Sequence, residues 1–316
     1  MIRGSLASKD YRPQLSGHET FPLRYGWLKK AYDAAVTAQQ EGDTKSVFSS
    51  DDAIARFGVG KNMVTSMRHW AIAGGILDDK TLEPTRFGHM IFDQEGLDPY
   101  MEHPATLWLI HWFLAGRPAR TTFYWAFGHY QDSTFERRNL VNGLTELAQE
   151  QQWHRAASST IKRDVECFVR VYAAKQASGK SNHEDALESP LTELGIIRPI
   201  GLQDGFRFVR GPKPTLGQGV FLYALHQFCQ ERQMTSSSLR FEAIAHDPGS
   251  PGRVFRLDED ALFGRLQEIH DISKGKFAWS ESTGLKQVIR HAELTEEDAF
   301  DAIRSDYRFR ESREVA

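Results

Sequence analysis

Residues 51–75 read DDAIARFGVGKNMVTSMRHWAIAGG and combine two short helical patterns with a glycine turn between them. A first helix is expected over residues 51–57, with Ser49 or Ser50 as its N-cap. The Gly-Val-Gly sequence at 58–60 makes the turn. A second helix is expected over residues 62–73, because apolar residues recur there on one side at the helical period. This order predicts a helix-turn-helix unit.

The second helix of this unit has two contrasting sides. The side expected to face the interior carries Met63, Val64, Met67, Trp70 and Ala71. The side expected to face outward carries Lys61, Asn62, Thr65, Arg68 and His69. Basic and amide side chains on one helix face suit contacts with DNA phosphates and base edges, so we predict that these five residues bind DNA. Helix pairs of this kind also occur as purely structural units, which is the alternative.

The segment after the helix-turn-helix could form a small wing. Gly74 and Gly75 end the second helix, and apolar residues flank a polar turn at 78–81. We therefore place an N-terminal helix-turn-helix module at residues 17–92. The Asp-Asp-Lys sequence at 78–80 superficially resembles the end of a metal-dependent nuclease motif. A solvated turn is the favoured interpretation, because Asp and Lys are common at such turns.

The remaining sequence predicts two further regions and a tail. Residues 93–186 form a helical middle with aromatic core stripes, and the polar stretch 176–185 is its best linker candidate. Residues 187–291 predict a C-terminal winged-helix-like module, with a hairpin over 196–209, helices starting near Thr215, Leu239 and Asp258, and a final two-stranded wing. Residues 292–316 are a charged tail that could hold one helix. The predicted fold class is mainly α, with helix-turn-helix or winged-helix modules at both ends around a helical middle, and short β-hairpins.

Five more basic residues are predicted to contact DNA. Lys162 and Arg163 lie near the start of an expected helix, and Arg253 follows a Gly-Ser-Pro-Gly turn. Lys286 and Arg290 are four residues apart on the expected wing strand, so they project from one face. Lys and Arg are mostly exposed in any protein, and solvated charge is therefore the alternative at each position.

The composition narrows the possible functions. A net charge of -3 over 316 residues argues against a protein that coats nucleic acid, because such binding needs many cations facing phosphates. Cys167 and Cys229 lie in separate helical patterns, so no structural zinc site is expected. Motifs for nucleotide binding, zinc proteolysis or serine hydrolysis are absent from the sequence. The lack of a signal-peptide pattern and of an apolar run long enough for a bilayer predicts a cytoplasmic protein without a membrane segment.

His18, Glu19 and Arg24 form the most suggestive polar cluster for catalysis. A histidine and a carboxylate can act as general base or metal ligand, and an arginine can hold a phosphate with two hydrogen bonds. We predict that these three residues serve phosphoryl chemistry, with Glu19 as ligand to a divalent Mg or Mn ion. The alternative is structural: Glu19 could cap the following helix while His18 hydrogen-bonds a loop.

Five separated motifs, in this order, carry a resemblance to a known family. They read GHETFPLRYGW at 17–27, FGVGKNMV at 57–64, TIKRDV at 160–165, SPLTELG at 189–195 and GSPGRVFRLD at 249–258. Together they resemble the SspB-like family, the DNA-nicking components of bacterial single-strand DNA phosphorothioation systems. The resemblance extends over about residues 17–291. It carries no residue-level catalytic assignment, so the predicted sites above rest on their chemistry.

The resemblance implies a phage-defence protein that nicks DNA so that sulfur can enter the backbone. Its implied partners are DNA, a cysteine desulfurase, an ATPase and an adenylating sulfurtransferase. We expect a homodimer that hydrolyses a phosphodiester with a divalent metal. The alternative is a non-enzymatic adaptor or transcriptional regulator with winged-helix domains, since the sequence shows no dense cluster of catalytic carboxylates.

Overall fold

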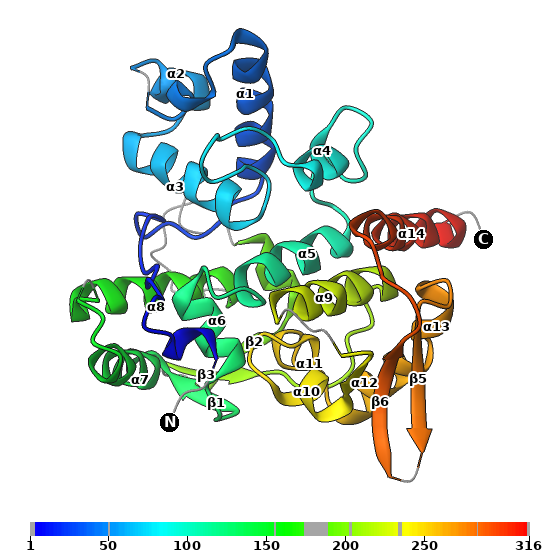
Figure 1. The fold of residues 1–316 in the computed structure, drawn as a ribbon. Helices are drawn as coiled ribbons and strands as arrows, with labels where there is room; N and C mark the ends of the chain where they lie inside the picture. Colours follow the sequence, from blue (N-terminus) through cyan, green and yellow to red (C-terminus); the bar gives the residue numbers. More distant parts are fainter. Residues whose placement is uncertain are drawn as a thin grey trace. The chain divides into compact units, whose positions relative to one another are not determined.

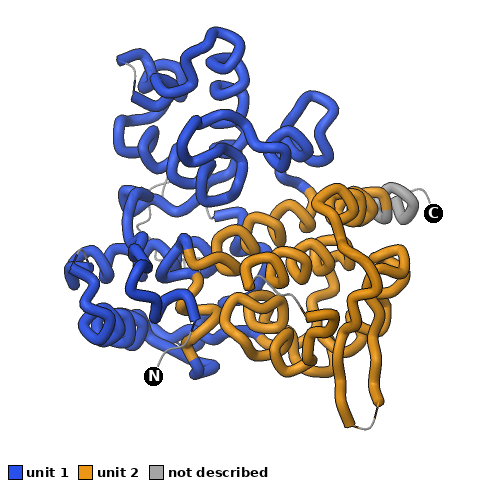
Figure 2. The backbone as a smooth tube through the Cα atoms, in the orientation of Figure 1, with its two compact units in different colours: residues 1–102, 119–123, 131–209 blue, residues 103–118, 124–130, 210–316 orange. Residues whose placement is uncertain are grey.

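The structure is a computed structural model that describes residues 4–49, 51–154, 156–173, 189–201, 204–232, 236–282 and 284–314. Two compact units make up the chain, and Figure 2 colours them separately. Unit 1 contains Met1–Glu102, Ala119–Phe123 and Gln131–Val209, whereas unit 2 contains His103–Pro118, Tyr124–Tyr130 and Arg210–Ala316. Each unit is assembled from three separate segments. The expected division at residues 92, 186 and 291 stays a prediction, and the expected linker at 176–185 lies outside the described residues.

The N-terminal part of unit 1 is helical (Figure 1). It contains two 3-10 turns, η1 (Ser5–Ala7) and η2 (Thr44–Ser46), and the helices α1 (Trp27–Glu41), α2 (Ala53–Phe57), α3 (Lys61–Ala73) and α4 (Arg86–Phe92). Helix α2 ends at Gly58, whose φ of 67° closes the turn into α3. Val64, Met67, Trp70 and Ala71 are buried as predicted, and Met63 is half-buried. In the segment expected to form a small wing after α3, an antiparallel bridge joins Leu77 to Pro84. The residue that pairs with Leu77 therefore lies beyond Leu82.

The second part of unit 1 joins two helices to a small sheet. Its elements are β1 (Thr134–Glu136), α7 (Arg137–Glu150), α8 (Ser158–Tyr172), η4 (Pro190–Leu194), β2 (Ile197–Ile200) and β3 (Gly205–Phe208). The strands form an antiparallel sheet in the order β1-β3-β2. The predicted hairpin over 196–209 is confirmed, with Ile197 opposite Phe208. The strand β1 leads directly into α7, and Glu136 caps this helix in a capping box with Asn139.

Unit 2 holds a buried helix, α5 (Pro104–Ala115), and a second antiparallel sheet. The other elements are α9 (Gln218–Glu231), β4 (Ser238–Arg240), α10 (Phe241–His246), α11 (Pro251–Val254), α12 (Glu259–Gln267), α13 (Ile269–Ile272), β5 (Phe277–Ser282), β6 (Leu285–Arg290) and α14 (Glu296–Glu314). Its sheet has the order β4-β6-β5. One more helix, α6 (Thr121–Gly128), contributes residues to both units. The described chain is therefore mainly helical, with two small three-stranded sheets.

The start of α9 shows how tertiary contacts set a helix boundary. The helix expected to start near Thr215 begins at Gln218 instead. The carboxylate of Asp306 on α14 instead accepts hydrogen bonds from the backbone N–H groups of Gly219, at 3.0 Å, and Val220, at 2.8 Å. These are N–H groups that a helix leaves without an internal partner. The charged tail thus supplies the cap, and α14 is the helix that the tail could hold.

The aromatic residues of 104–127 and both cysteines are buried, as the sequence patterns indicate. Trp108, Trp112 and Phe255 are buried together in unit 2, with Phe255 ring centroids 5.7 and 5.6 Å from the two tryptophans. Cys167 and Cys229 are both buried free thiols. Burial raises the pKa of the Cys229 thiol to about 11, so this sulfur is a packing group rather than a nucleophile. Within the described residues, none of the helices is long and apolar enough to cross a membrane.

Candidate functional site

His18 is buried and uses both of its ring nitrogens to hold a loop. Its Nε2 lies 2.8 Å from a carboxylate oxygen of Asp164 on α8, and its Nδ1 lies 3.0 Å from the backbone nitrogen of Thr20. Because the Thr20 N–H donates to Nδ1, the ring proton lies on Nε2 and is donated to Asp164. His18 therefore positions the loop and has no spare nitrogen to act as a general base in this arrangement.

The loop that contains His18 is anchored on two helices and is strained at its tip. The Phe21 carbonyl accepts a hydrogen bond from Trp70 Nε1 at 3.0 Å, and the Thr20 carbonyl accepts one from Arg170 on α8 at 3.0 Å. Glu19 and Thr20 have φ angles of 46° and 67°. Positive φ is unusual for a branched residue such as Thr, so these anchors must hold the tip in place. Strain held by surrounding contacts is a recurrent property of functional loops.

The structure does not join His18, Glu19 and Arg24 through any described contact. Glu19 is exposed at the tip of the loop, and its carboxylate makes no hydrogen bond or ion pair with a described residue. Arg24 is half-buried and stacks on the rings of Phe21 and Trp27, at 5.6 and 5.5 Å. His18 points inward and Glu19 outward because the chain turns here: the Phe21 N–H donates to the His18 carbonyl at 2.8 Å.

Helix α3 exposes the predicted DNA-binding face. Lys61, Asn62, Thr65 and Arg68 are exposed, and His69 is half-buried. These residues recur at spacings of three and four, so they lie along one side of the helix. The opposite side of α3 consists of buried residues. One of them, Trp70, donates a hydrogen bond from its indole to the Phe21 carbonyl in the loop of His18. The structure therefore presents this face outward, as a DNA-contacting helix would require.

A pocket of about 300 Å³ lies beside this face, within unit 1. It brings together the lead segment before His18, helix α3, the turn after α3 and the residues before α6. The lining residues are Gln14, Ser16, Gly17, Thr65, Arg68, His69, Ile72, Asp79, Ala119 and Arg120. Three of the predicted DNA-binding residues, Thr65, Arg68 and His69, are among them.

The charged groups of this pocket have no hydrogen-bonding partner in the described chain. Arg120 is half-buried, and burial lowers the pKa of its guanidinium, while Asp79 and Asp164 act in the opposite direction. Burial, and then the positive charge of Arg120, lower the pKa of His69 well below its ordinary value. The pocket thus contains two guanidinium groups, one neutral imidazole and one carboxylate. Such a set suits an anion that accepts several hydrogen bonds.

Gly17 is required by the geometry of this pocket. Its φ is 105°, and a Cβ placed on it would lie 2.6 Å from Nδ1 of His69. Only glycine lets the backbone pass so close to the imidazole at this angle. The glycine of the GHET motif therefore shapes the candidate site by allowing the backbone to pack directly against His69 of α3.

Sequence reasoning missed Asp164 and Arg120. Asp164 lies on the buried side of α8 between Ile161 and Val165. A lone carboxylate on an apolar helical stripe is a signal for a buried partner, because an unpaired charge is costly inside a protein. No pattern in the neighbouring sequence indicates a role for Arg120, because only the folded chain brings it beside the other residues of the pocket.

The other predicted DNA-binding residues have different surroundings. Lys162 and Arg163 are exposed on α8. Arg253 donates to the carbonyl oxygens of Gly128 and Tyr130 at 2.9 to 3.1 Å, so its guanidinium is occupied inside unit 2. Lys286 lies 3.8 Å from the Glu281 carboxylate and 5.8 Å from the Phe263 ring, and Arg290 is half-buried. Lys286 and Arg290 do share one face of β6, but buried Val288 lies on that face between them.

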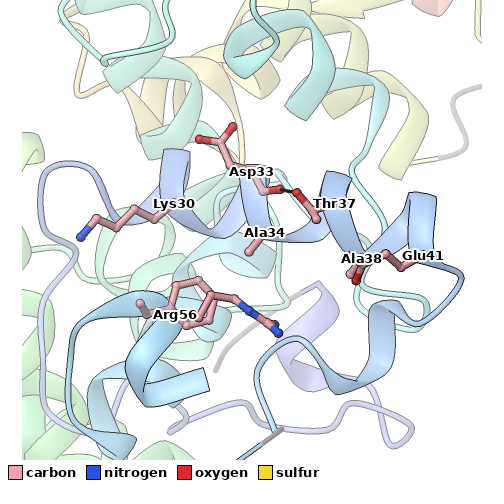
Figure 3. A pocket seen from close by; sticks show the side chains of 8 residues that line it. Lys30, Asp33, Ala34, Thr37, Ala38, Glu41 and Arg56 are labelled. Atoms are coloured by element: carbon pink, nitrogen blue, oxygen red, sulfur yellow. Dashed lines mark hydrogen bonds between the residues drawn. The ribbon is translucent and has the colours of Figure 1, made fainter. Parts of the chain in front are cut away.

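A larger pocket of about 430 Å³ lies between α1 and α2 (Figure 3). Its charged groups are two cations, Lys30 and Arg56, and two carboxylates, Asp33 and Glu41. Arg56 pairs with Asp52 at 2.6 Å, and Asp33 pairs with Lys29 at 2.5 Å. In Figure 3 the Lys30 side chain points away from Arg56. Because its charges are balanced or already paired, this pocket is a weaker candidate than the pocket beside α3.

Among the described residues, Glu19 is not joined by the further ligands that the predicted metal site needs. In the described part of the chain, no group of three or more His, Cys, Asp or Glu side chains lies close enough to hold a metal ion. Glu19, the predicted ligand, belongs to no such group among the described residues. The described residues therefore do not fit a metal centre built from protein ligands alone.

Comparison with known proteins places this fold among characterised structures. The chain is similar to a structure described as magnesium ion-bound SspB, with 28% identity and a TM-score of 0.82, covering 97% of this chain and 91% of the other. A second SspB crystal structure is 26% identical with a TM-score of 0.80, covering 98% and 96%. Curated proteins provide no significant match. Residues 15–307 match the family described as protein of unknown function (DUF4007). Since this match spans most of the sequence, the chain belongs to the DUF4007 family.

Proposed function

We propose that this protein binds DNA through α3 and acts in a phosphorothioation-based phage-defence system. The observation that carries the proposal is the exposed row of Lys61, Asn62, Thr65 and Arg68, beside a pocket with two guanidinium groups that have no hydrogen-bonding partner among the described residues. Arginine and lysine bind phosphates, and asparagine can read base edges. The likeness to SspB structures supports the assignment to that defence system.

We further propose that both units contain winged-helix modules. In unit 1 the order is α1, α2 and α3, followed by the bridge from Leu77 to Pro84. In unit 2 the order is α9, β4, α10, α11, α12, α13, β5 and β6, with the sheet order β4-β6-β5. Helices followed by an antiparallel bridge in unit 1, and by the hairpin of β5 and β6 in unit 2, support a winged helix in each case.

Charge favours unit 1 over unit 2 as the proposed DNA-contacting unit. In a helix-turn-helix, the start of the recognition helix contacts base edges. Helix α3 starts with Lys61 and Asn62, whereas α12 starts with Glu259 and Asp260 after the cap Asp258. Three carboxylates would repel the DNA backbone. Unit 2 is therefore the better surface for protein partners, which by the resemblance are the desulfurase, the ATPase, the adenylating sulfurtransferase and a second copy of the chain.

DNA nicking is the activity we propose for the pocket beside α3. Arg68 and Arg120 would stabilise the added negative charge of the pentavalent phosphate. His69, which lines the same pocket, could donate a proton to the leaving oxygen of the cleaved strand. Glu19 remains a proposed catalytic carboxylate, because it is exposed on the strained loop that begins at the pocket.

The alternative function is a non-enzymatic DNA adaptor. It is favoured by one observation, the lack of a three-ligand metal group in the described part of the chain. Incubation of supercoiled plasmid with the purified protein separates the two. Nicked circles that form with Mg²⁺ or Mn²⁺ and vanish with chelator support the nickase, whereas a mobility shift without nicking supports the adaptor.

An electrophoretic mobility assay on a short duplex tests the DNA contact itself. Arg68→Ala should weaken binding and reduce the slope of log affinity against log salt by about one, because one phosphate contact is lost. Arg138→Ala is the matched control, since Arg138 is an exposed arginine of unit 1 whose partner is Glu136 at 2.7 Å. Equal affinity and slope in the two variants would refute the proposed role of α3.

A further inference from the structure

We propose that the pocket beside α3 is a subsite for one phosphodiester group of a DNA strand, and that filling it drives proton uptake by His69. This inference rests on the proposed DNA-binding function. It adds the ligand group, the residues that hold it and a coupling between binding and pH.

The hydrogen-bonding groups of the pocket match a phosphodiester. Arg68 comes from α3 and Arg120 from the segment before α6, and neither guanidinium has a hydrogen-bonding partner among the described residues. The side chains of Gln14 and Ser16 add neutral donors from the lead segment. Two guanidinium groups approaching from different segments can hold the two non-bridging oxygens of one phosphate.

The net charge of the lining also matches that ligand. Arg68 and Arg120 contribute two positive charges, and Asp79 is the carboxylate that lines the same pocket. The remaining charge of +1 complements a phosphodiester, which carries a single negative charge. A volume of about 300 Å³ is at the small end of ligand pockets, so it suits one backbone unit rather than the body of a duplex. The duplex itself would lie over Lys61 and Asn62 of α3.

His69 is the group that responds to the ligand. Its ring lies against Gly17, 5.7 Å from the ring of His18 and 5.1 Å from that of Trp70, and it makes no hydrogen bond with a described residue. The charged groups around it are Arg68 on α3, Arg120 before α6, Asp79 on the turn, and Asp164 of α8 behind His18. Burial and Arg120 keep the ring neutral when the pocket is empty.

A bound phosphodiester reverses this balance. Its negative charge offsets that of Arg120 and offers an acceptor oxygen to a protonated imidazole. The pKa of His69 therefore rises on binding, and the complex takes up a proton. Affinity should increase as pH falls, by up to about tenfold per pH unit between the pKa of the empty state and that of the bound state.

The test uses the full-length protein and the dinucleoside phosphodiester dTpdT as probe, titrated by calorimetry between pH 5.5 and 7.5. Buffers with different ionisation enthalpies report the number of protons taken up. We expect proton uptake and tighter binding at low pH for the unmodified protein, and binding without either effect for His69→Gln. Binding of dTpdT without proton uptake, or equal pH dependence in His69→Gln, would overturn the coupling.

Two further variants test the subsite, and the first of them predicts a gain in affinity that misfolding could not cause. Asp79→Asn removes the carboxylate of the lining and should tighten dTpdT binding several-fold, whereas a damaged fold could only weaken it. Arg120→Lys keeps the charge but loses the paired hydrogen bonds, and should weaken dTpdT binding by about tenfold. Unchanged affinity in both variants would place the phosphate elsewhere.

The duplex mobility assay separates failure of this inference from failure of the proposed function. If Lys61→Ala weakens duplex binding while the Asp79 and Arg120 variants bind dTpdT normally, the DNA function holds and the subsite is wrong. If the unmodified protein binds neither duplex nor dTpdT, the proposed function itself is wrong.

Discussion

Gly17 shows how one residue can determine the shape of the candidate site. Its positive φ and its closeness to His69 both exclude a side chain. Gly17→Ala should lower the free energy of unfolding by about 2 kcal/mol, from the left-handed conformation and the contact with the imidazole. Gly264→Ala is the control, because a Cβ there meets no atom within 4 Å. In helix α12 this change should stabilise by about 0.5 to 1 kcal/mol. Similar denaturation midpoints for the two variants would contradict this account of Gly17.

Glu19 is the residue at which structure and chemistry can be separated most cleanly. It is exposed and has no described partner, so Glu19→Gln should change the free energy of unfolding by about 0.5 kcal/mol at most. DNA affinity should also be retained, while plasmid nicking is lost if the carboxylate takes part in the chemistry. A variant that nicks as well as the unmodified protein would remove Glu19 from the proposed site. A thermal melt on the same sample shows whether the fold is intact.

At the scale of elements, Arg253 links the start of α11 to the end of α6 within unit 2. Its guanidinium makes three hydrogen bonds to the carbonyl oxygens of Gly128 and Tyr130. Arg253→Lys cannot reproduce this planar set and should cost about 1.5 to 3 kcal/mol of stability without weakening DNA binding. Arg232→Lys is the matched control, since Arg232 forms a half-exposed ion pair with Asp247 and should contribute less than about 1 kcal/mol. Weaker DNA binding with unchanged stability would restore the DNA role predicted for Arg253.

At the scale of the whole molecule, buried histidines predict sensitivity to acid. Burial is the main cause that lowers the pKa of His111 to about 3 and that of His129 to about 4, and it also lowers the pKa of His69 and His226. Below the ordinary pKa of about 6.5, the unfolded chain binds protons that the folded chain excludes. The free energy of unfolding should therefore fall as pH drops from about 6.5 toward 4, by up to about 1.4 kcal/mol per pH unit for each histidine.

Urea denaturation at pH 7.5, 6.5, 5.5 and 4.5 measures this slope. His111→Gln should show a shallower decline, because the fully buried ring that donates from Nε2 to the Val254 carbonyl is gone. The exposed His270 is the control position, and His270→Gln should follow the unmodified protein. A stability that stays constant between pH 6.5 and 4.5 would show that these rings titrate normally in the folded state.

Local patterns in the sequence were sufficient for the helices and for the first hairpin. The spacing of Val64, Met67 and Trp70 predicts the buried side of α3, because helical periodicity is a property of neighbouring residues. The predicted element boundaries were wrong where a residue distant in the sequence pairs with the backbone. The strand β1 pairs with β3, and α9 starts where Asp306 reaches its backbone. Neither partner is near in sequence, so no local pattern contains the information.

The candidate site depends on contacts over still longer separations. His18 reads as a general base in the sequence, but Asp164, 146 residues away, makes it a buried anchor. Arg253 reads as a surface cation, but carbonyl oxygens about 125 residues away enclose it. The chemical type of each side chain can be read from the chain, whereas its burial and partners depend on packing between segments. Arg68, His69, Asp79 and Arg120 become one pocket only when those segments fold together, because the fold alone brings their charges into one partly desolvated space.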